Sequence, residues 1–558
     1  MNTASSASEP AYILEISKKL KRGAERRAIR DERDSLDKME QRACEQLRTG
    51  GIALRDKEGR ARTQGDILID IGRRHTLFCN TEGVAYAQYL REKHLEVHAL
   101  DSHEFREFLA GTYYRISGRG CNKNALTDAV ITLSAQARFS GKSHPVFLRV
   151  GACDDANDAL SGEQHSGGGN IVIDIGEPNW RTIRVTTRSW QVEDGGAVMF
   201  RRAGKSQPLP LPANGNFDKL WRYLNVQEAD RVLVAAFLLM ALHPSGPYPV
   251  LLLSGEHGTG KSSFCRILKR LIDPSSSPLR SPPKDTRDLL VASLNSWLLC
   301  VDNVSWLSSQ MSDALCRLAT GGAISERTLY TNLDETLVEL KRPVILNGIE
   351  ELGTRPDLLS RGIRVELQPI SGYFCEKEWW AAFETDAPAI FGGLLAGLTR
   401  ALRDAGTIQL NALPRMADFA VWSAAGLPAL GFTSEEFLAA YNKNLGEGMT
   451  SGLENSPVGR ALQSFMAART DWSGTATDLL SDLARHTDEI ALRSPYWPRS
   501  AHALRSNLNR LAPALRGAGI YVEHSRDSDQ RTITLCCSPE SASLASFSKQ
   551  RSSGGAEI

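Results

Sequence analysis

The sequence predicts an α/β protein whose centre is a parallel β-sheet covered by helices. Three uninterrupted apolar runs support this prediction, at Val250–Leu253, Trp297–Val301 and Pro343–Leu346. Such runs are typical of strands that are buried on both faces of a sheet. Apolar residues recur at helical spacing over 263–271, after the first run and a glycine-rich turn. We therefore expect a strand, a turn and a helix to follow one another there.

The composition excludes several classes of protein. At 558 residues the chain is too long for one core, and we expect about three or four domains. The formal net charge is +1, so any affinity for nucleic acid needs local basic patches. The ten cysteines contain no C-x-x-C pair, which argues against a zinc site or a disulfide framework. The longest apolar run, Val232–Leu242, is too short to span a bilayer. We expect a cytoplasmic protein that contacts no membrane.

The glycine-rich turn reads G-x-x-x-x-G-K-S, the pattern of a phosphate-binding loop. Its glycines let backbone N–H groups converge on an anion, and the following helix directs its positive end to the same place. We expect Lys261 to reach the β- and γ-phosphates of ATP and Ser262 to hold Mg²⁺. The alternative is a glycine-rich turn with an unrelated lysine. The residues expected to contact ATP are Gly255, Glu256, His257, Gly258, Thr259, Gly260, Lys261, Ser262 and Ser263.

Polar residues end the other two predicted strands. Asp302 would orient the Mg²⁺ ion, as carboxylates do at this point in phosphate-loop enzymes. Asn347 would lie between the two halves of the site and position the attacking water. The alternative for Asn347 is a turn cap before Gly348. Further along, Arg361 lies where a helix ends and a strand begins, and we expect it to reach the γ-phosphate of a neighbouring subunit. The alternative is a surface arginine at a helix C-terminus.

These motifs together resemble the superfamily 3 helicase-like AAA+ ATPases attached to primases of phages, plasmids and integrative elements. The resemblance covers about residues 215–445. The segments that carry it are Gly255–Ser262, Val301–Asn303, Ala319–Thr331, Val344–Ile349 and Leu358–Arg361.

The resemblance implies a homohexameric ring that translocates on DNA. A hairpin over 327–342 would face the pore, and Arg327, Lys341 and Arg342 would contact single-stranded DNA there. One position departs from the pattern, because Asn303 stands where many such enzymes have an acid. A carboxamide can orient water but cannot accept its proton. Three explanations stay open: another acid (Glu326, Glu350 or Glu351) serves, hydrolysis is slow, or asparagine suffices.

We expect five regions along the chain. An α+β module of unknown role would contain strands at Ile67–Ile71 and Ile171–Ile175. The regions are a charged helix or arm at 1–50, the α+β module at 51–206, the ATPase core at 216–445, a winged-helix-like domain at 458–538 and a disordered tail at 539–558.

The winged-helix-like domain would be a second DNA contact. Its presumed recognition helix, Ser500–Leu515, carries Arg505 and Arg510, and the tip of its predicted hairpin carries Arg526. Arginines on one local surface suit binding to the phosphates of duplex DNA. The alternative is a module that contacts proteins.

The sequence thus predicts an ATP-driven, Mg²⁺-dependent ring motor, a DNA helicase or translocase that replicates a mobile genetic element. The alternative is a nucleotide-dependent switch in a regulatory or anti-phage assembly that separates no strands. A third hypothesis is a DNA-binding scaffold that merely keeps ATP bound. Either of the first two would act with replication or defence partner proteins.

Overall fold

The computed structural model describes residues 52–537, except 53, 55, 57, 141, 154–168, 196–197, 328–334, 349–355, 371, 373–374, 495 and 527–530. The chain divides into two compact units, and the division falls after Val146. The predicted module at 51–206 spans this division, so its second part belongs to the unit that contains the phosphate loop. The predicted arm at 1–50 and tail at 539–558 lie outside the described residues.

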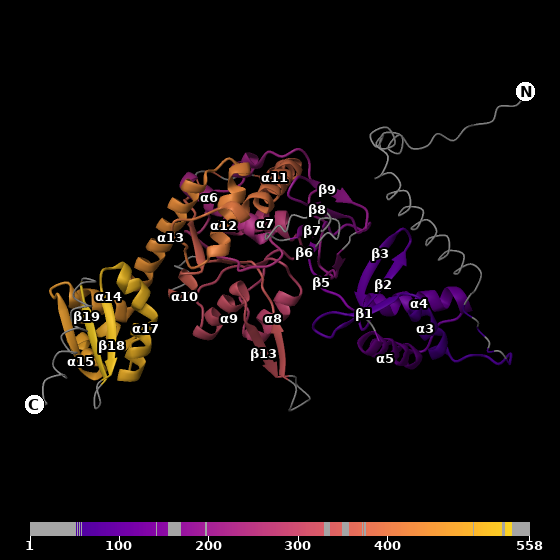
Figure 1. The fold of residues 1–558 in the computed structure, drawn as a ribbon, viewed down its shortest axis with the longest axis horizontal. Helices are drawn as coiled ribbons and strands as arrows, with labels where there is room; N and C mark the ends of the chain where they lie inside the picture. Colours follow the sequence, from indigo (N-terminus) through magenta and orange to yellow (C-terminus); the bar gives the residue numbers. More distant parts are fainter. Residues whose placement is uncertain are drawn as a thin grey trace, which may run out of the picture. The chain divides into compact units, whose positions relative to one another are not determined.

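The described part of the first unit contains a four-stranded sheet and three helices (Figure 1). Helices α4 and α5 contact the sheet, and α3 packs against both of these helices. The strand order is β3-β2-β1-β4; β1 pairs antiparallel with β2 and parallel with β4. The elements are α3 (Gln64–Arg73), β1 (Thr76–Cys79), β2 (Ala85–Arg91), β3 (His94–Ala99), α4 (His103–Ser117), α5 (Lys123–Ser140) and β4 (Lys142–Ser143).

The predicted strand at Ile67–Ile71 is wrong, because these residues form part of α3. The Thr63 side chain caps this helix by accepting a hydrogen bond from the backbone N–H of Asp66. Ile67, Leu68 and Ile71 share the face that is buried in the core of the unit. A short apolar run fits a buried strand and a buried helix equally well, and here the N-terminal cap and the packing select the helix.

The second unit begins with an antiparallel sheet in the order β6-β7-β8-β9. Strand β7 confirms the predicted strand at Ile171–Ile175. The elements of this region are β5 (Val146–Phe147), which straddles the division, β6 (Val150–Cys153), β7 (Asn170–Asp174), β8 (Thr182–Val185), β9 (Trp190–Glu193) and β10 (Met199–Phe200).

The centre of the second unit is a parallel sheet in the order β12-β15-β11-β16. Alternate residues of β11 join two different hydrophobic clusters: Leu251 and Leu253 join one, and Val250 and Leu252 join the other. The sheet is therefore buried on both faces, as the apolar runs predicted. The strands and the helices between them are β11 (Val250–Ser254), α7 (Lys261–Ile272), α8 (Thr286–Leu294), β12 (Leu299–Val301), α9 (Ser309–Thr320), β15 (Val344–Asn347), α10 (Pro356–Leu359) and β16 (Gly362–Glu366).

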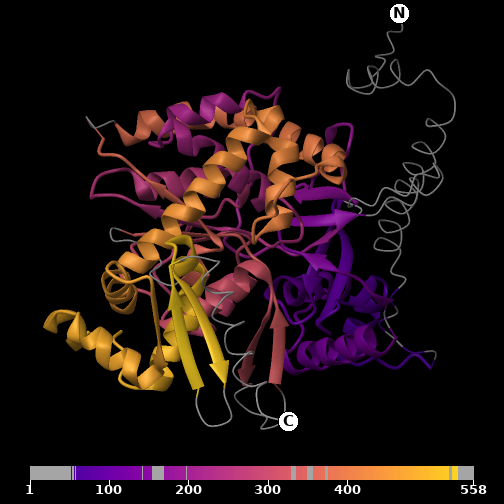
Figure 2. The same cartoon turned by 60° about the vertical axis from the view of Figure 1, so that its left-hand side comes forward.

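A hairpin and a layer of helices complete this core. The hairpin of β13 (Ala323–Arg327) and β14 (Glu335–Glu339) follows α9 and projects away from the sheet (Figure 2). The helices are η2 (Phe217–Arg222), α6 (Glu228–Ala241), α11 (Glu376–Asp404), η3 (Ala405–Thr407), α12 (Ala417–Gly426), η4 (Leu427–Leu430) and α13 (Ser434–Glu454).

Helix α13 continues to Glu454, through most of the interval that the predicted ATPase core (216–445) and winged-helix-like domain (458–538) leave between them. Of its glycines, Gly452 serves close packing, since a Cβ there would lie 2.9 Å from the Leu359 side chain, whereas one at Gly446 would meet no atom within 4 Å. The helix therefore runs unbroken from the core to the C-terminal domain (Figure 1).

The C-terminal domain has three longer helices and a sheet in the order β17-β19-β18 around its own core. The predicted helix at Ser500–Leu515 and the predicted hairpin are present, whereas β17 and α16 were not predicted. The elements are α14 (Pro457–Met466), β17 (Asp471–Thr475), α15 (Ala476–Arg485), α16 (Glu489–Arg493), α17 (Ala501–Gly517), β18 (Tyr521–Arg526) and β19 (Arg531–Cys536).

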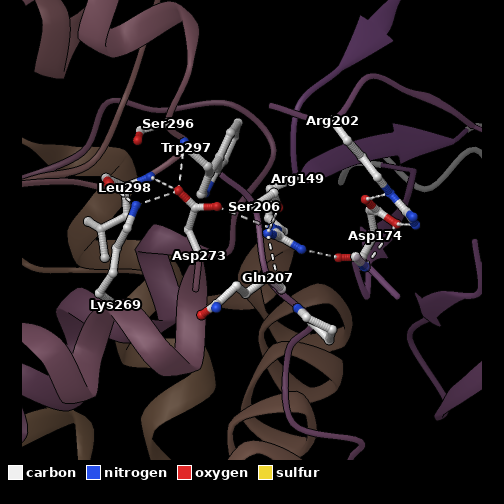
Figure 3. Close-up of polar contacts among 12 residues, drawn as sticks. Arg149, Asp174, Arg202, Ser206, Gln207, Lys269, Asp273, Ser296, Trp297 and Leu298 are labelled. Carbon is white, nitrogen blue, oxygen red and sulfur yellow. Dashed lines mark hydrogen bonds and ion pairs between the residues drawn. The ribbon is translucent and has the colours of Figure 1, made fainter. Parts of the chain in front are cut away.

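A buried ion cluster joins the antiparallel sheet to the phosphate-loop helix (Figure 3). Asp273, just after α7, accepts hydrogen bonds from Lys269 Nζ at 2.6 Å and from Arg149 Nε at 3.2 Å. It also accepts the backbone N–H groups of Trp297 and Leu298, at 2.9 and 3.1 Å. Arg149 lies before β6 and donates further to the carbonyls of Asp174, Ile175 and Gln207. Every group of this cluster is thus paired.

We predict that Asp273→Asn destabilises the second unit by about 3–5 kcal/mol, because it leaves two buried cations without their anion. Burial alone would raise the pKa of Asp273, but the charges of Lys269 and Arg149 lower it to about 2. The wild-type contribution should therefore persist above about pH 4 and disappear as the pH falls towards 2. Thermal unfolding would measure both effects. Glu489→Gln, which breaks an exposed pair with Arg493, is the control and should leave the melting temperature unchanged.

Candidate functional site

The phosphate loop lies between the carboxyl end of β11 and the first turn of α7. Gly255, Gly258 and Gly260 adopt positive φ angles of 142°, 81° and 85°. Only glycine adopts such angles readily. A Cβ at Gly255 would also lie 2.7 Å from the carbonyl oxygen of Leu367. The loop therefore needs these glycines both for its shape and for its close approach to the end of β16.

Lys261 begins α7 and its side chain folds back over the loop. Its Nζ donates to the carbonyl oxygens of Gly255 and Glu256, each at 2.6 Å. Partial burial lowers the pKa of Lys261, and the charge of Asp302 opposes that effect. The ammonium group therefore lies at the N-terminus of a helix, where an anion is favoured.

Three polar side chains meet at the carboxyl edge of the parallel sheet. The Ser262 hydroxyl donates to both carboxylate oxygens of Asp302, at 3.2 Å each. Asn347 Nδ2 donates to the same carboxylate. Strand β15 lies between β11 and β12, so Asn347 lies between the phosphate loop and Asp302. Hydroxyl and carboxylate oxygens are ligands that Mg²⁺ accepts alongside water, so the residues present fit a bound Mg²⁺ ion.

Asn303 follows the carboxylate with a positive φ of 59° and an exposed side chain. Asparagine tolerates this left-handed conformation better than most residues other than glycine. The backbone therefore offers a reason for asparagine that is separate from catalysis. Of the acids considered as substitutes, Glu350 and Glu351 and the side chain of Glu326 lie outside the described residues.

Arg361 lies at the opposite edge of the sheet from the phosphate loop. Its carbonyl oxygen accepts a hydrogen bond from Val250 N, at the start of β11. Val250 lies five residues before Gly255 along β11, which corresponds to a distance of about 16 Å between the two backbones. The Arg361 guanidinium donates to Asp357 Oδ1 at 3.1 Å. Arg415, which the sequence analysis missed, donates to Ser360 Oγ at 2.6 Å and so holds the same turn.

Asn225 is a second residue that sequence reasoning missed. Its Nδ2 donates to the carbonyl oxygens of Thr259, in the phosphate loop, at 3.1 Å, and of Gln368, after β16. It therefore ties the loop to the neighbouring strand. No motif marks Asn225, because both partners are distant along the chain.

The three hairpin cations have different surroundings. Arg342 donates to the Ser293 carbonyl at 3.1 Å, and its guanidinium lies 5.2 Å from the Trp297 ring centroid. Lys341 is half-buried, and its stem packs beside Gly321. The side chain of Arg327 lies outside the described residues. The structure thus places Arg342 in internal contacts at the base of the hairpin.

The arginines of the C-terminal domain lie on and beside α17. Leu504, Leu508, Leu511 and Leu515 form the buried face of this helix. Arg510 is exposed and donates to Asn507 Oδ1 at 2.9 Å. Arg505 lies close enough to His524 of β18 to help burial lower the pKa of that histidine. The side chain of Arg526 lies outside the described residues.

The described residues contain neither a membrane-spanning helix nor a cluster of metal ligands. No helix there is long and apolar enough to cross a bilayer. No group of three or more His, Cys, Asp or Glu side chains gathers there in a way that could hold a metal ion.

The structure defines an α/β protein with a polar site at the carboxyl edge of a parallel sheet. Residues 217–450 match the family model described as actinomycete integrative conjugative element replication protein. Residues 458–547 match the model of the RepA C-terminal domain from the same elements. Over these two regions the chain is similar to the RepA replication proteins of such elements.

More distant comparisons add only structural likeness. Two solved structures of the C-terminal region of NrS-1 in its apo form match with TM-scores of 0.36 and 0.33 and with 11% and 12% identity. Each match covers 85% of this chain and 98% of the other. No curated protein matches the chain. Likeness at this level carries no argument about function.

Proposed function

We propose that the protein is a Mg²⁺-dependent ATPase and a DNA-translocating ring motor that serves replication of its element. The observation that carries this proposal is the meeting of Ser262, Asp302 and Asn347 beside the phosphate loop. A loop alone indicates phosphate binding. A hydroxyl, a carboxylate and a carboxamide at its mouth supply what hydrolysis needs in addition, namely an oxygen ligand set for a metal and a donor that orients water.

Each residue has a distinct part in this proposal. The loop N–H groups and Lys261 would bind the β- and γ-phosphates and neutralise their charge. Ser262 and Asp302 would hold Mg²⁺, which stabilises charge on the phosphate oxygens when bound. Asn347 would orient the attacking water. Asn225 would keep the loop in shape by anchoring Thr259 to the end of β16.

Arg361 supports an assembly of several copies. Since it lies about 16 Å along β11 from the phosphate loop, it cannot reach a nucleotide bound in its own chain. An arginine held at that edge by Asp357 and beside Arg415 suits contact with the γ-phosphate of an adjacent copy. A ring in which each copy completes its neighbour's site is the arrangement that we propose.

A second function remains a candidate because of Asn303. Its carboxamide cannot accept the proton of an attacking water, which favours slow hydrolysis. A slow ATPase would suit a nucleotide-dependent switch that changes its contacts and separates no strands. The rate of hydrolysis with and without single-stranded DNA distinguishes the two functions, because a motor requires stimulation by DNA.

We predict that Lys261→Ala and Asp302→Ala each reduce ATP hydrolysis by at least about 100-fold, because each removes charge stabilisation at the reacting phosphate. Phosphate release measured with and without Mg²⁺ would test this. Lys443→Ala is the matched control, since that lysine forms an exposed pair with Glu447. Hydrolysis by both site variants at the wild-type rate would show that the site is assigned incorrectly.

We predict that mixing Arg361→Ala with Lys261→Ala restores part of the ATPase activity that each variant lacks alone. Some mixed interfaces would contain one intact loop and one intact arginine. Activity of the mixture should exceed the sum of the separate variants, and mass measurement with ATP and DNA should show an oligomer. A protein that stays monomeric under these conditions would contradict the trans assignment.

We propose a second DNA contact at α17 and predict that Arg505→Ala combined with Arg510→Ala weakens binding to duplex DNA. The slope of log K against log salt should become shallower by about two, if each arginine meets one phosphate. Fluorescence anisotropy of the full chain over a salt series measures this. Arg493→Ala, on exposed α16, is the control. An unchanged slope would place this domain among protein-contact modules.

A further inference from the structure

The first unit contains a cavity of about 730 Å³, a size that suits a small ligand. It lies between α4, the end of α3 and the β2–β3 hairpin. Three aromatic side chains line it. The rings of Tyr89 and Phe108 stack at 4.0 Å between centroids, and His75 meets Phe108 edge-on at 5.1 Å. Tyr89 is buried in this stack, so Phe108 and His75, both half-buried, are the rings on which a flat ligand can pack.

Gly111 opens one wall of this cavity. It lies inside α4, where glycine is less favourable than almost any other residue. A Cβ at this position would meet no atom within 4 Å, so packing within the described chain does not require glycine. Phe108, Thr112 and Arg115 line the cavity from the same face of the helix. The absent side chain leaves room for a ligand to approach the helix.

Neutral hydrogen-bonding groups also line the cavity. Burial, helped by the charge of Arg74, lowers the pKa of His75 to about 4, so its imidazole is neutral and offers one donor and one acceptor. Among the described residues, no partner hydrogen-bonds that imidazole. This lining suits the edge of a polar heterocycle.

The charges around the cavity are balanced. Arg115 donates to the hydroxyl of Thr112 at 3.0 Å, and Glu107 pairs with His103 at 3.1 Å. A balanced set does not attract a long polyanion, but its guanidinium groups can hold a single phosphate. The charged residues that line the cavity are Arg74, Arg91, Arg115, Glu92, Glu104 and Glu107.

We propose that this cavity binds one nucleotide unit, with its base on the aromatic rings and its phosphate at the arginines. The base could belong to a free nucleotide or to an unpaired position in a DNA strand, since both present the same chemistry. Stacking on aromatic side chains binds bases with little dependence on sequence. The inference is independent of the proposed ATPase, because the two sites share no residue.

The test uses the full chain with Lys261→Ala, so that the phosphate loop does not compete. Thymidine monophosphate and a five-nucleotide oligothymidine are the probes, and saturation-transfer NMR detects binding. Phe108→Ala and Gly111→Leu should each weaken binding at least tenfold. Gly111→Leu should keep or raise the melting temperature, because leucine favours the helix and fills open space. Phe139→Ala is the control, since that phenylalanine lies on α5 and is 90% exposed.

Monophosphate binding that Phe108→Ala and Gly111→Leu weaken would support a site for free nucleotides. Oligonucleotide binding that the same variants weaken, without monophosphate binding, would support capture of an unpaired base. Absence of binding by both probes would overturn the proposal. Binding that neither variant weakens would also overturn it, because such binding would arise at the DNA contacts proposed elsewhere in the chain.

Discussion

The arrangement of the second unit depends on one buried carboxylate. Asp273 receives Lys269 from its own helix, Arg149 from the antiparallel sheet and two backbone N–H groups from the approach to β12. Buried cations are tolerated only when they are paired. The carboxylate therefore fixes the end of the phosphate-loop helix, the strand that leads to Asp302 and the preceding sheet in one geometry. Residues 147–206 therefore belong to the second unit and do not form a separate domain.

The central sheet could be predicted because its signals are local. Each apolar run is followed by a residue of the candidate site or by the glycine-rich loop. The glycines of that loop lie close together in the sequence. Parallel strands then bring Ser262, Asp302 and Asn347 together without further information, since their carboxyl ends share an edge. The order of β11, β15 and β12 thus turned three separate motifs into one site.

Other features could not be predicted because long-range packing decides them. Ile67–Ile71 forms a helix because a cap and a core face select it. The two partners of Asn225 lie 34 and 143 residues away along the chain. Ser360, the partner of Arg415, lies 55 residues away. The five residues of β17 are mostly polar, and they form a strand because β19 supplies the pairing partner. The sequence alone also does not show that Gly452 of α13 packs against Leu359.

Helix α13 has a mechanical consequence. Its 21 residues correspond to about 31 Å of continuous rod. One part of the rod packs against the edge strand β16, and α13 also contacts α17 of the C-terminal domain. A domain carried in this way does not search space on a tether. Helix α17 also contacts α10 directly, so the rod and this second contact together hold the arginines of α17 at a set place relative to the edge strand.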